Sequence, residues 1–128
     1  MSAAQTLQAL TTAIDEHRWD DLPALLDPAF TCRYVHTGET LDRDGWVRLN
    51  AEYPGFERLV VEDLVADGDR AVCRAHVTGR SDGRLEHFEV ATFVTVRGGL
   101  VVEMTEVWTD VGQEAPPGTR PSVPPAEG

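Results

Sequence analysis

The sequence predicts an α+β fold in which a few helices precede a long antiparallel sheet. Apolar residues recur at helical spacing before Pro54-Gly55. After that point, stretches rich in Val, Thr and Phe alternate with short turns that contain Gly and Asp, a pattern typical of hairpin-connected strands. The length of 128 residues suits one domain, and no apolar run approaches the ~20 residues that span a bilayer.

Three helices are expected in the first part of the chain. The apolar face of the first, at about residues 4–17, is formed by Ala3, Leu7, Leu10 and Ile14. Asp20 and Asp21 are expected to cap a short second helix, which ends near Asp27. Asp42 is expected to cap the third helix, which ends at Pro54. One face of the third helix carries Trp46, Leu49, Asn50 and Tyr53.

A strand is expected at residues 30–36, between the second and third helices. Four longer strands then follow one another with short connections and form an antiparallel meander. These strands are expected at residues 58–66, 70–79, 85–97 and 100–110. A curved sheet wrapped round three helices leaves a cleft between them. The domain is expected to occupy residues 1–112, and the Pro-rich tail at 113–128 is expected to be irregular.

The charge and the cysteine content exclude several classes of function. The net charge is −11, from 22 acidic residues against 11 basic ones, and this field disfavours nucleic-acid and membrane-surface partners. Cys32 and Cys73 are too few for a disulfide scaffold, so a reduced cytoplasm is expected. Residues 1–5 lack the features of a secretory signal. We find no set of residues with metal-ligand spacing and no Gly-rich phosphate loop, so neither a metal nor a cofactor is expected.

Three segments resemble the SnoaL-like branch of the nuclear transport factor 2-like superfamily. They are the turn Trp19-Asp20-Asp21-Leu22, the hairpin Ala66-Asp67-Gly68-Asp69-Arg70 and the last strand, Gly99-Leu100-Val101-Val102-Glu103-Met104-Thr105-Glu106-Val107-Trp108-Thr109-Asp110. The resemblance covers roughly residues 4–112 and implies a cone, in which a bent sheet surrounds a pocket and the helices close it. This family includes isomerases, dehydratases, polyketide cyclases and epoxide hydrolases, so the fold leaves the chemistry open.

Strand alternation predicts which side chains face the cone. On the strand at 70–79 the apolar odd positions should face inward, and on the strand at 85–97 the even positions should do so. If residues 97–99 form a three-residue loop, Val96 pairs with Leu100 and Thr92 pairs with Met104, whereas a two-residue turn would invert the last strand. The three-residue loop is expected, so that Met104, Glu106 and Trp108 face inward.

Glu106 is the principal catalytic candidate, because its inward neighbours Met104 and Trp108 are apolar. Burial there would raise the pKa of its carboxyl group and suit it to general acid–base work. The alternative is that Glu106 caps a backbone amide or pairs with an Arg. Tyr34 and His36 have the parity of Cys32 and are expected to donate a hydrogen bond and to shuttle a proton, respectively. The alternative for His36 is a solvent position at the end of the strand.

The expected ligand pocket extends beyond these three residues. It comprises Trp46, Asn50, Tyr53, Cys73, Ala75, Phe88, Val90, Thr92, Met104 and Trp108. The resemblance to the steroid isomerases would place their catalytic Tyr and two Asp at Leu10, Tyr34 and Thr92. None of the three is kept, so that mechanism is not expected. The inner rows also lack the Arg that the acid–Arg–acid set of the epoxide hydrolases requires.

Two functions remain. The first is a small-molecule pocket protein that acts as a cofactor-free cyclase, isomerase or dehydratase on an apolar carbonyl or hydroxyl compound. The second is a non-catalytic ligand-binding or protein-interaction module, a homodimer through the outer face of the sheet. The apolar patch expected there consists of Val72, Ala91, Phe93 and Val107. His76 and Glu89 are expected to form a cross-strand pair on the same face.

Overall fold

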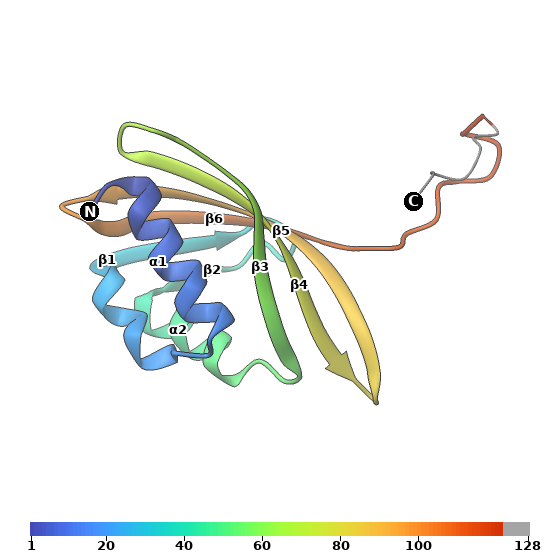
Figure 1. Ribbon diagram of the computed structural model, residues 1–128, viewed down its shortest axis with the longest axis horizontal. Helices are drawn as coiled ribbons and strands as arrows, with labels where there is room; N and C mark the ends of the chain where they lie inside the picture. The colour runs from blue at the N-terminus through green and yellow to red at the C-terminus, as the bar shows by residue number, and fades with distance from the viewer. Residues whose placement is uncertain (122–128) are drawn as a thin grey trace.

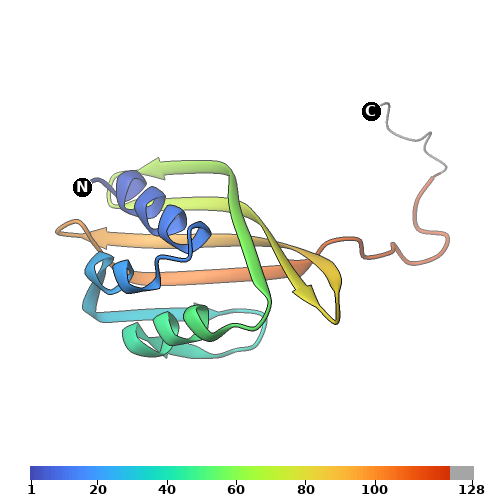
Figure 2. The same ribbon diagram turned by 60° about the horizontal axis from the view of Figure 1, so that its bottom comes forward.

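The computed structural model describes residues 1–121, and within them six strands form one curved sheet. The strands are β1 (Leu26–Tyr34), β2 (Thr40–Asp42), β3 (Phe56–Asp67), β4 (Arg70–Ser81), β5 (Arg84–Arg97) and β6 (Leu100–Asp110). Their order across the sheet is β2-β1-β6-β5-β4-β3 (Figure 2). All neighbours are antiparallel except β1 and β6, which pair in parallel. The expected α+β fold with a curved sheet is therefore confirmed.

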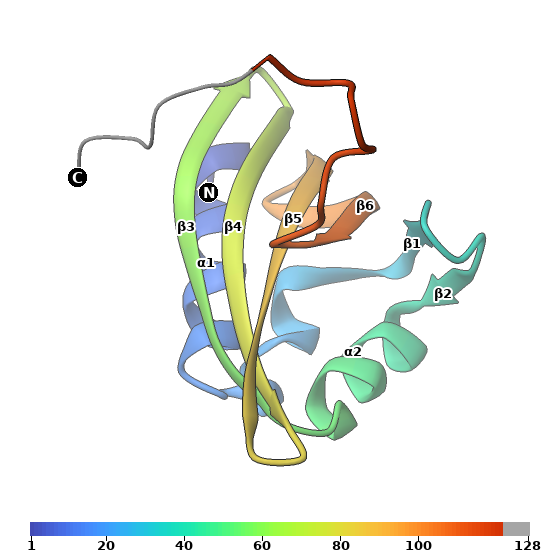
Figure 3. The same ribbon diagram turned by 90° about the vertical axis from the view of Figure 1, so that its right-hand side faces the viewer.

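Two α-helices lie on the concave side of the sheet (Figures 1 and 3). Helix α1 (Ala3–Asp15) begins with a capping box between Ser2 and Gln5. Helix α2 (Arg43–Glu52) begins at Asp42, whose Oδ1 accepts a hydrogen bond of 2.8 Å from the Gly45 amide. This contact confirms the expected cap at Asp42. None of the helices in residues 1–121 is long and apolar enough to cross a membrane.

The expected second helix is replaced by two 3₁₀ turns, Trp19–Asp21 and Pro23–Leu25. The expected caps are wrong, because Asp20 and Asp21 lie inside the first turn and no side chain caps either turn. Asp21 instead pairs with Arg18. Strand β1 begins at Leu26, earlier than expected, because its first residue already pairs with Val101 of β6. The short strand β2 was not expected from the sequence.

The hairpin between β5 and β6 corrects the expected register. The turn has two residues, Gly98 and Gly99, both with positive φ, and Arg97 pairs with Leu100. A β-bulge follows, because Val96 pairs with Val101 while Thr95 pairs with Glu103. Val102 is the extra residue, and it restores the alternation that the short turn would have inverted. The inward row of β6 therefore carries the expected residues, but Met104 pairs with Val94, and Thr92 pairs with Glu106.

The core lies between α1, α2 and the concave face. Its fully buried side chains include Leu7, Leu10, Leu22, Phe30, Trp46, Val94 and Val101. The end of α1 is fixed to β3 by Asp15, whose carboxylate accepts hydrogen bonds of 2.7 and 3.1 Å from Arg58 and 3.0 Å from the Leu59 amide. Residues 111–121 contain bends and turns and lead away from the sheet (Figure 1). The part of the expected irregular tail at 122–128 lies outside the described residues.

Candidate functional site

Glu106 occupies the middle of a row of side chains that runs across the concave face. Its register partners are Tyr34 on β1 and Thr92 on β5, and Thr92 in turn pairs with Cys73 on β4. Because β1 is parallel to β6, Tyr34 joins this row from the opposite side to Thr92. The row thus brings together one carboxyl, one phenol, one hydroxyl and one thiol.

The Glu106 carboxyl group is buried, with 5% of the residue exposed. Thr92 Oγ1 donates a hydrogen bond of 3.0 Å to its Oε2, and Trp46 Nε1 donates one of 3.4 Å to its Oε1. Burial raises the pKa of this carboxyl group, and the hydrogen bonds from Thr92 and Trp46 oppose that rise. Among the described residues, its side-chain partners include neither an Arg nor a backbone amide.

Burial favours the neutral forms of the ionisable side chains near Glu106. Burial, followed by the charge of Glu106, raises the pKa of Tyr34 and the pKa of Cys32 far above their ordinary values. The same two causes raise the pKa of Cys73 to about 11. Both cysteines are buried and free. They therefore act as small apolar residues near Glu106, and Tyr34 stays a neutral phenol that can donate a hydrogen bond.

A cavity of about 230 Å³ lies next to this row. Its walls come from the end of α2, from the end of β1 and the residues that follow it, and from β3, β4, β5 and β6. The lining residues are Tyr34, His36, Leu49, Asn50, Tyr53, Phe56, Val77, Thr78, Gly79, Phe88, Trp108 and Asp110. Most of the lining is apolar or aromatic, with a few polar groups, as in typical small-molecule sites.

The cavity brings together six of the residues predicted from the sequence: Tyr34, His36, Asn50, Tyr53, Phe88 and Trp108. The other predicted residues do not line it but lie in the core beside it. These are Trp46, Cys73, Ala75, Val90, Thr92, Met104 and Glu106, all of them buried. The physical reason is that Trp46 packs against Phe30, with ring centroids 5.6 Å apart, in the inner part of the cone. The open space is therefore displaced toward the other end of the sheet.

Sequence reasoning missed Leu49, Phe56, Val77, Thr78, Gly79 and Asp110 as lining residues. A usable signal existed for Asp110, because it continues the inward row of Glu106 and Trp108 on β6. A signal also existed for Leu49, which lies on the same helix face as Trp46 and Asn50. Phe56 and Gly79 gave none, because they are register partners at the outer ends of their strands.

Two polar side chains stand near Tyr34 at the cavity. His36 is exposed, and its ring centroid lies 5.2 Å from that of Tyr34 and 6.4 Å from that of Trp108. It thus lies in solvent after the end of β1 and also lines the cavity. Asn50 donates a hydrogen bond of 2.8 Å from Nδ2 to the Trp46 carbonyl oxygen, which fixes its amide on the helix face.

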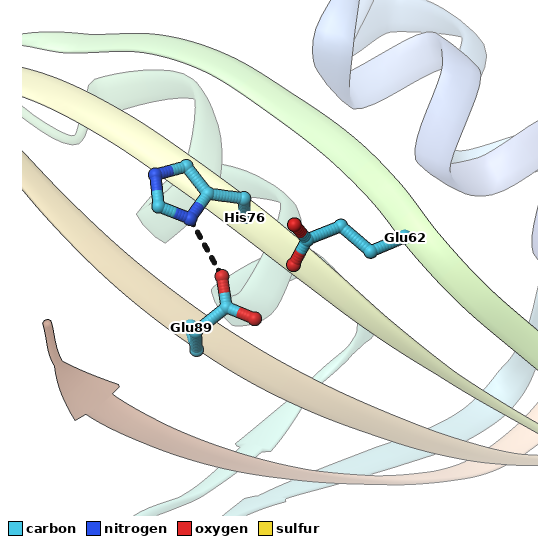
Figure 4. A group of neighbouring side chains, drawn as sticks. All are labelled: Glu62, His76 and Glu89. Atoms are coloured by element: carbon cyan, nitrogen blue, oxygen red, sulfur yellow. Dashed lines mark hydrogen bonds and ion pairs between the residues drawn. The ribbon is translucent and has the colours of Figure 1, made fainter. Parts of the chain in front are cut away.

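The outer face of the sheet carries a second polar group, formed by Glu62, His76 and Glu89 (Figure 4). His76 Nδ1 lies 2.7 Å from Glu89 Oε2, so the expected cross-strand pair is confirmed. Glu62 joins them because β3 bulges between Val61 and Asp63, which sequence reasoning did not detect. The ligand atoms are close enough to hold a metal ion.

The contacts of Arg74 show whether Glu62, His76 and Glu89 are better described as a metal site or as an ion-pair network. Its Nη1 lies 2.7 Å from Glu62 Oε1 and 2.9 Å from Glu89 Oε1. The guanidinium therefore pairs with both carboxylates, and a divalent cation would have to displace it. The group is an ion-pair network on the sheet surface.

The curved sheet, the helices on its concave side and the adjoining cavity define a protein of the nuclear transport factor 2-like fold. A model of the SnoaL-like domain family matches residues 7–104. The chain belongs to that family, and the resemblance inferred from the sequence is confirmed. No protein of curated function matches the chain.

Solved structures agree on the fold. A candidate ketosteroid isomerase from Kribbella flavida is 28% identical, with a TM-score of 0.80 over 95% of this chain and 90% of the other. IdmH, a candidate polyketide cyclase from Streptomyces antibioticus, is 20% identical, with a TM-score of 0.74 over 84% and 92%. An LEH-like epoxide hydrolase from Mycobacterium tuberculosis is 16% identical, with a TM-score of 0.72 over 84% and 82%. At these identities, the last two likenesses concern the fold alone.

Proposed function

We propose that the protein binds a small, mostly apolar molecule in this cavity and holds a carbonyl or hydroxyl oxygen against the Tyr34 hydroxyl. The observation that carries the proposal is the position of Tyr34, which is buried in the core and also lines the cavity. A phenol hydroxyl at the apolar floor of a pocket is desolvated when a ligand binds, and this costs free energy unless a ligand oxygen accepts a hydrogen bond from it. A ligand that carries such an oxygen is therefore favoured over a pure hydrocarbon.

Glu106 would orient the Tyr34 hydroxyl without touching the ligand. With its pKa raised by burial, the carboxyl group tends to keep its proton, and a protonated carboxyl can donate a hydrogen bond. Glu106 itself does not line the cavity, but its neighbours Tyr34 and Trp108 do, so it acts on the cavity through them. If the carboxyl donates to the phenol oxygen, the phenol hydrogen is free to point at the ligand. Glu106 then acts as a positioning residue rather than by direct contact with the ligand.

The chemistry that suits this arrangement is proton transfer at a carbon next to a carbonyl group, without a cofactor. Tyr34 would stabilise the negative charge that develops on the oxygen, and His36 would accept and return the proton. Cyclisation, isomerisation and dehydration of carbonyl compounds share this step. The two free, buried cysteines suit a reducing compartment, and we place the protein in the cytoplasm.

Hydrogen–deuterium exchange tests this proposal independently of the natural substrate. The bicyclic ketone 2-tetralone is incubated with the protein in D₂O, and loss of the signals of the hydrogens next to its carbonyl is followed by ¹H NMR. We expect exchange above the buffer rate, and a loss of about 100-fold in the enzymatic rate for Tyr34→Phe and His36→Gln. His87→Gln, on the outer face, is the matched control and should keep the wild-type rate.

Two results would count against this proposal. If 2-tetralone binds but exchanges at the buffer rate, the protein is a ligand-binding module and not an enzyme of this kind. If His36→Gln exchanges as fast as the wild type, His36 is not the proton acceptor. The alternative of a protein-interaction module has its own supporting observation, since Phe93 and Val107 on the outer face are 39% and 43% exposed.

A further inference from the structure

The described lining of the cavity carries a negatively charged side chain at its mouth. Among residues 1–121, Asp110 is the one acidic residue that lines the cavity, and none of the lining residues is an Arg. Asp110 extends the inward row of β6 past Trp108 and pairs in register with Phe88. Its carboxylate is exposed, so it stands at the mouth rather than at the floor. Within residues 1–121, the ion pairs of the protein do not include Asp110.

Aromatic rings make up much of the remaining wall. They belong to Tyr34, Tyr53, Phe56, Phe88 and Trp108. Phe88 and Trp108 meet edge to face, with ring centroids 6.5 Å apart. Phe88 is the register partner of Asp110 on β5, and Trp108 precedes Asp110 by two residues on β6. The faces of aromatic rings attract cations, and Trp attracts them most strongly. The mouth therefore offers a cation two kinds of contact, an ion pair and a ring face.

We infer that the molecules this cavity takes carry an alkylated ammonium group, held at the mouth by Asp110 and Trp108, while the apolar part extends inward to Tyr34. This inference rests on the proposed function, since it names the class of ligand for the same cavity. An alkylated ammonium fits better than a primary one, because its methyl groups replace the water that an –NH₃⁺ group would keep. The net charge of −11 adds to the attraction at long range.

The same features disfavour an anionic ligand. A carboxylate or phosphate would meet the Asp110 carboxylate and find no Arg among the lining residues that the structure describes.

Two probes of nearly the same shape test the inference. Choline carries a trimethylammonium group and a hydroxyl, and 3,3-dimethylbutan-1-ol replaces the charged nitrogen by carbon. Binding is measured by chemical-shift changes of ¹⁵N-labelled full-length protein. We expect choline to bind about fivefold more tightly, the size that an exposed ring contact and an exposed ion pair provide together. This preference should fall to about twofold or less in Asp110→Asn and in Trp108→Leu.

Asp82→Asn is the matched control, because Asp82 is an exposed acid at the tip of the β4–β5 hairpin and its backbone has a positive φ that Asn tolerates. It should keep the fivefold preference. Equal or tighter binding of the neutral alcohol overturns the inference and leaves the cavity proposal intact. So does binding of 2-tetralone by a protein that binds neither of the two probes. If the protein binds none of the three molecules, the proposed function fails as well.

Discussion

Tyr34 and Glu106 are register partners on the parallel strands β1 and β6, and of the two only Tyr34 lines the cavity. The carboxyl group is thereby one side chain removed from any bound molecule. Its influence on a ligand has to pass through neighbours that line the cavity, which are Tyr34 and Trp108. The protonation state of Glu106 therefore affects the packing of the core as well as the chemistry of the cavity.

The stability of the protein should therefore depend on pH through Glu106. Because burial raises the folded-state pKa above the unfolded value of about 4.5, the folded protein keeps a proton that the unfolded chain has lost. The contribution to the free energy of unfolding is fully present below that unfolded value. It is lost as the pH rises through the folded-state pKa.

Urea unfolding of the wild type and of Glu106→Gln, followed by tryptophan fluorescence from pH 4 to pH 8, checks this expectation. The stability of the wild type relative to the variant should fall as the pH rises, because Gln does not titrate. Glu103→Gln, an exposed position on the same strand, should show no such trend. A difference that stays constant would mean that folding does not shift the pKa of Glu106, and a difference that rises with pH would mean that the folded state stabilises the carboxylate. Either result would contradict the expectation.

Asp15 should show the opposite dependence. Its hydrogen bonds from Arg58 hold the pKa of this carboxyl group below its usual 3.8, against the opposing effect of burial. Its contribution to stability is present above that value and is lost as the pH falls through the folded-state pKa. We expect Asp15→Asn to lower the free energy of unfolding by about 1 kcal/mol at pH 7, since the partner is exposed.

Thermal unfolding at pH 7 and pH 3 measures this effect. The loss in Asp15→Asn should shrink at the lower pH, which lies below the ordinary pKa of 3.8, because the unfolded chain is then protonated and the folded state gains less from keeping the carboxylate charged. Asp67→Asn, at the exposed end of the same strand β3, serves as the control and should change little. An equal loss at both pH values would show that the charge of Asp15 is irrelevant to the contact between α1 and β3.

Val102 should be dispensable both as a side chain and as the extra residue of the bulge. Val102→Ala keeps the bulge and should cost no more than about 1 kcal/mol, because the side chain is only half-buried. Deletion of Val102 would remove the bulge and leave Glu103, directly after Val101, opposite Thr95, so that Met104 and Glu106 still face inward. We expect the deletion variant to keep cooperative unfolding in circular dichroism. A deletion variant that loses cooperative unfolding would show that the sheet needs the bend of the bulge as well as the alternation.

The outer face should mediate self-association. Phe93 and Val107 are exposed there, next to the half-buried Val72 and Ala91, on neighbouring strands. We expect light scattering after size exclusion to give the mass of a dimer for the wild type and of a monomer for Phe93→Glu. Leu85→Glu, an exposed position near the β4–β5 turn whose register partner is Arg80, lies away from this patch and should stay dimeric. A wild type that is monomeric at high concentration would remove the dimer from the account.

Several features of the fold were predictable from the residues alone. The alternation on β4 and β5 identified the inward faces, and the apolar neighbours of Glu106 indicated that it is buried. Both predictions depend on the alternation of side chains along single strands, which the folded sheet retains. The cross-strand pair of His76 and Glu89 was also predictable, because the turn before β5 fixes the register.

Other features depend on contacts that the sequence pattern does not encode. The bulge at Val102 changed the pairing of Met104 and Glu106 while leaving their direction unchanged, so alternation alone could not reveal it. The parallel pairing of β1 with β6 joins residues far apart in the chain. The position of the cavity depends on how Trp46 and Phe30 fill the inner cone, which is a matter of side-chain packing in three dimensions.

The central claim is that Tyr34 recognises an oxygen of the bound molecule. The most direct test compares the affinities of 2-tetralone and of tetralin, its oxygen-free counterpart, for the wild type and for Tyr34→Phe. We expect the wild type to bind the ketone about tenfold more tightly, the contribution of one hydrogen bond in an apolar site, and the variant to bind both molecules equally. The same preference for the ketone in both proteins would contradict the claim.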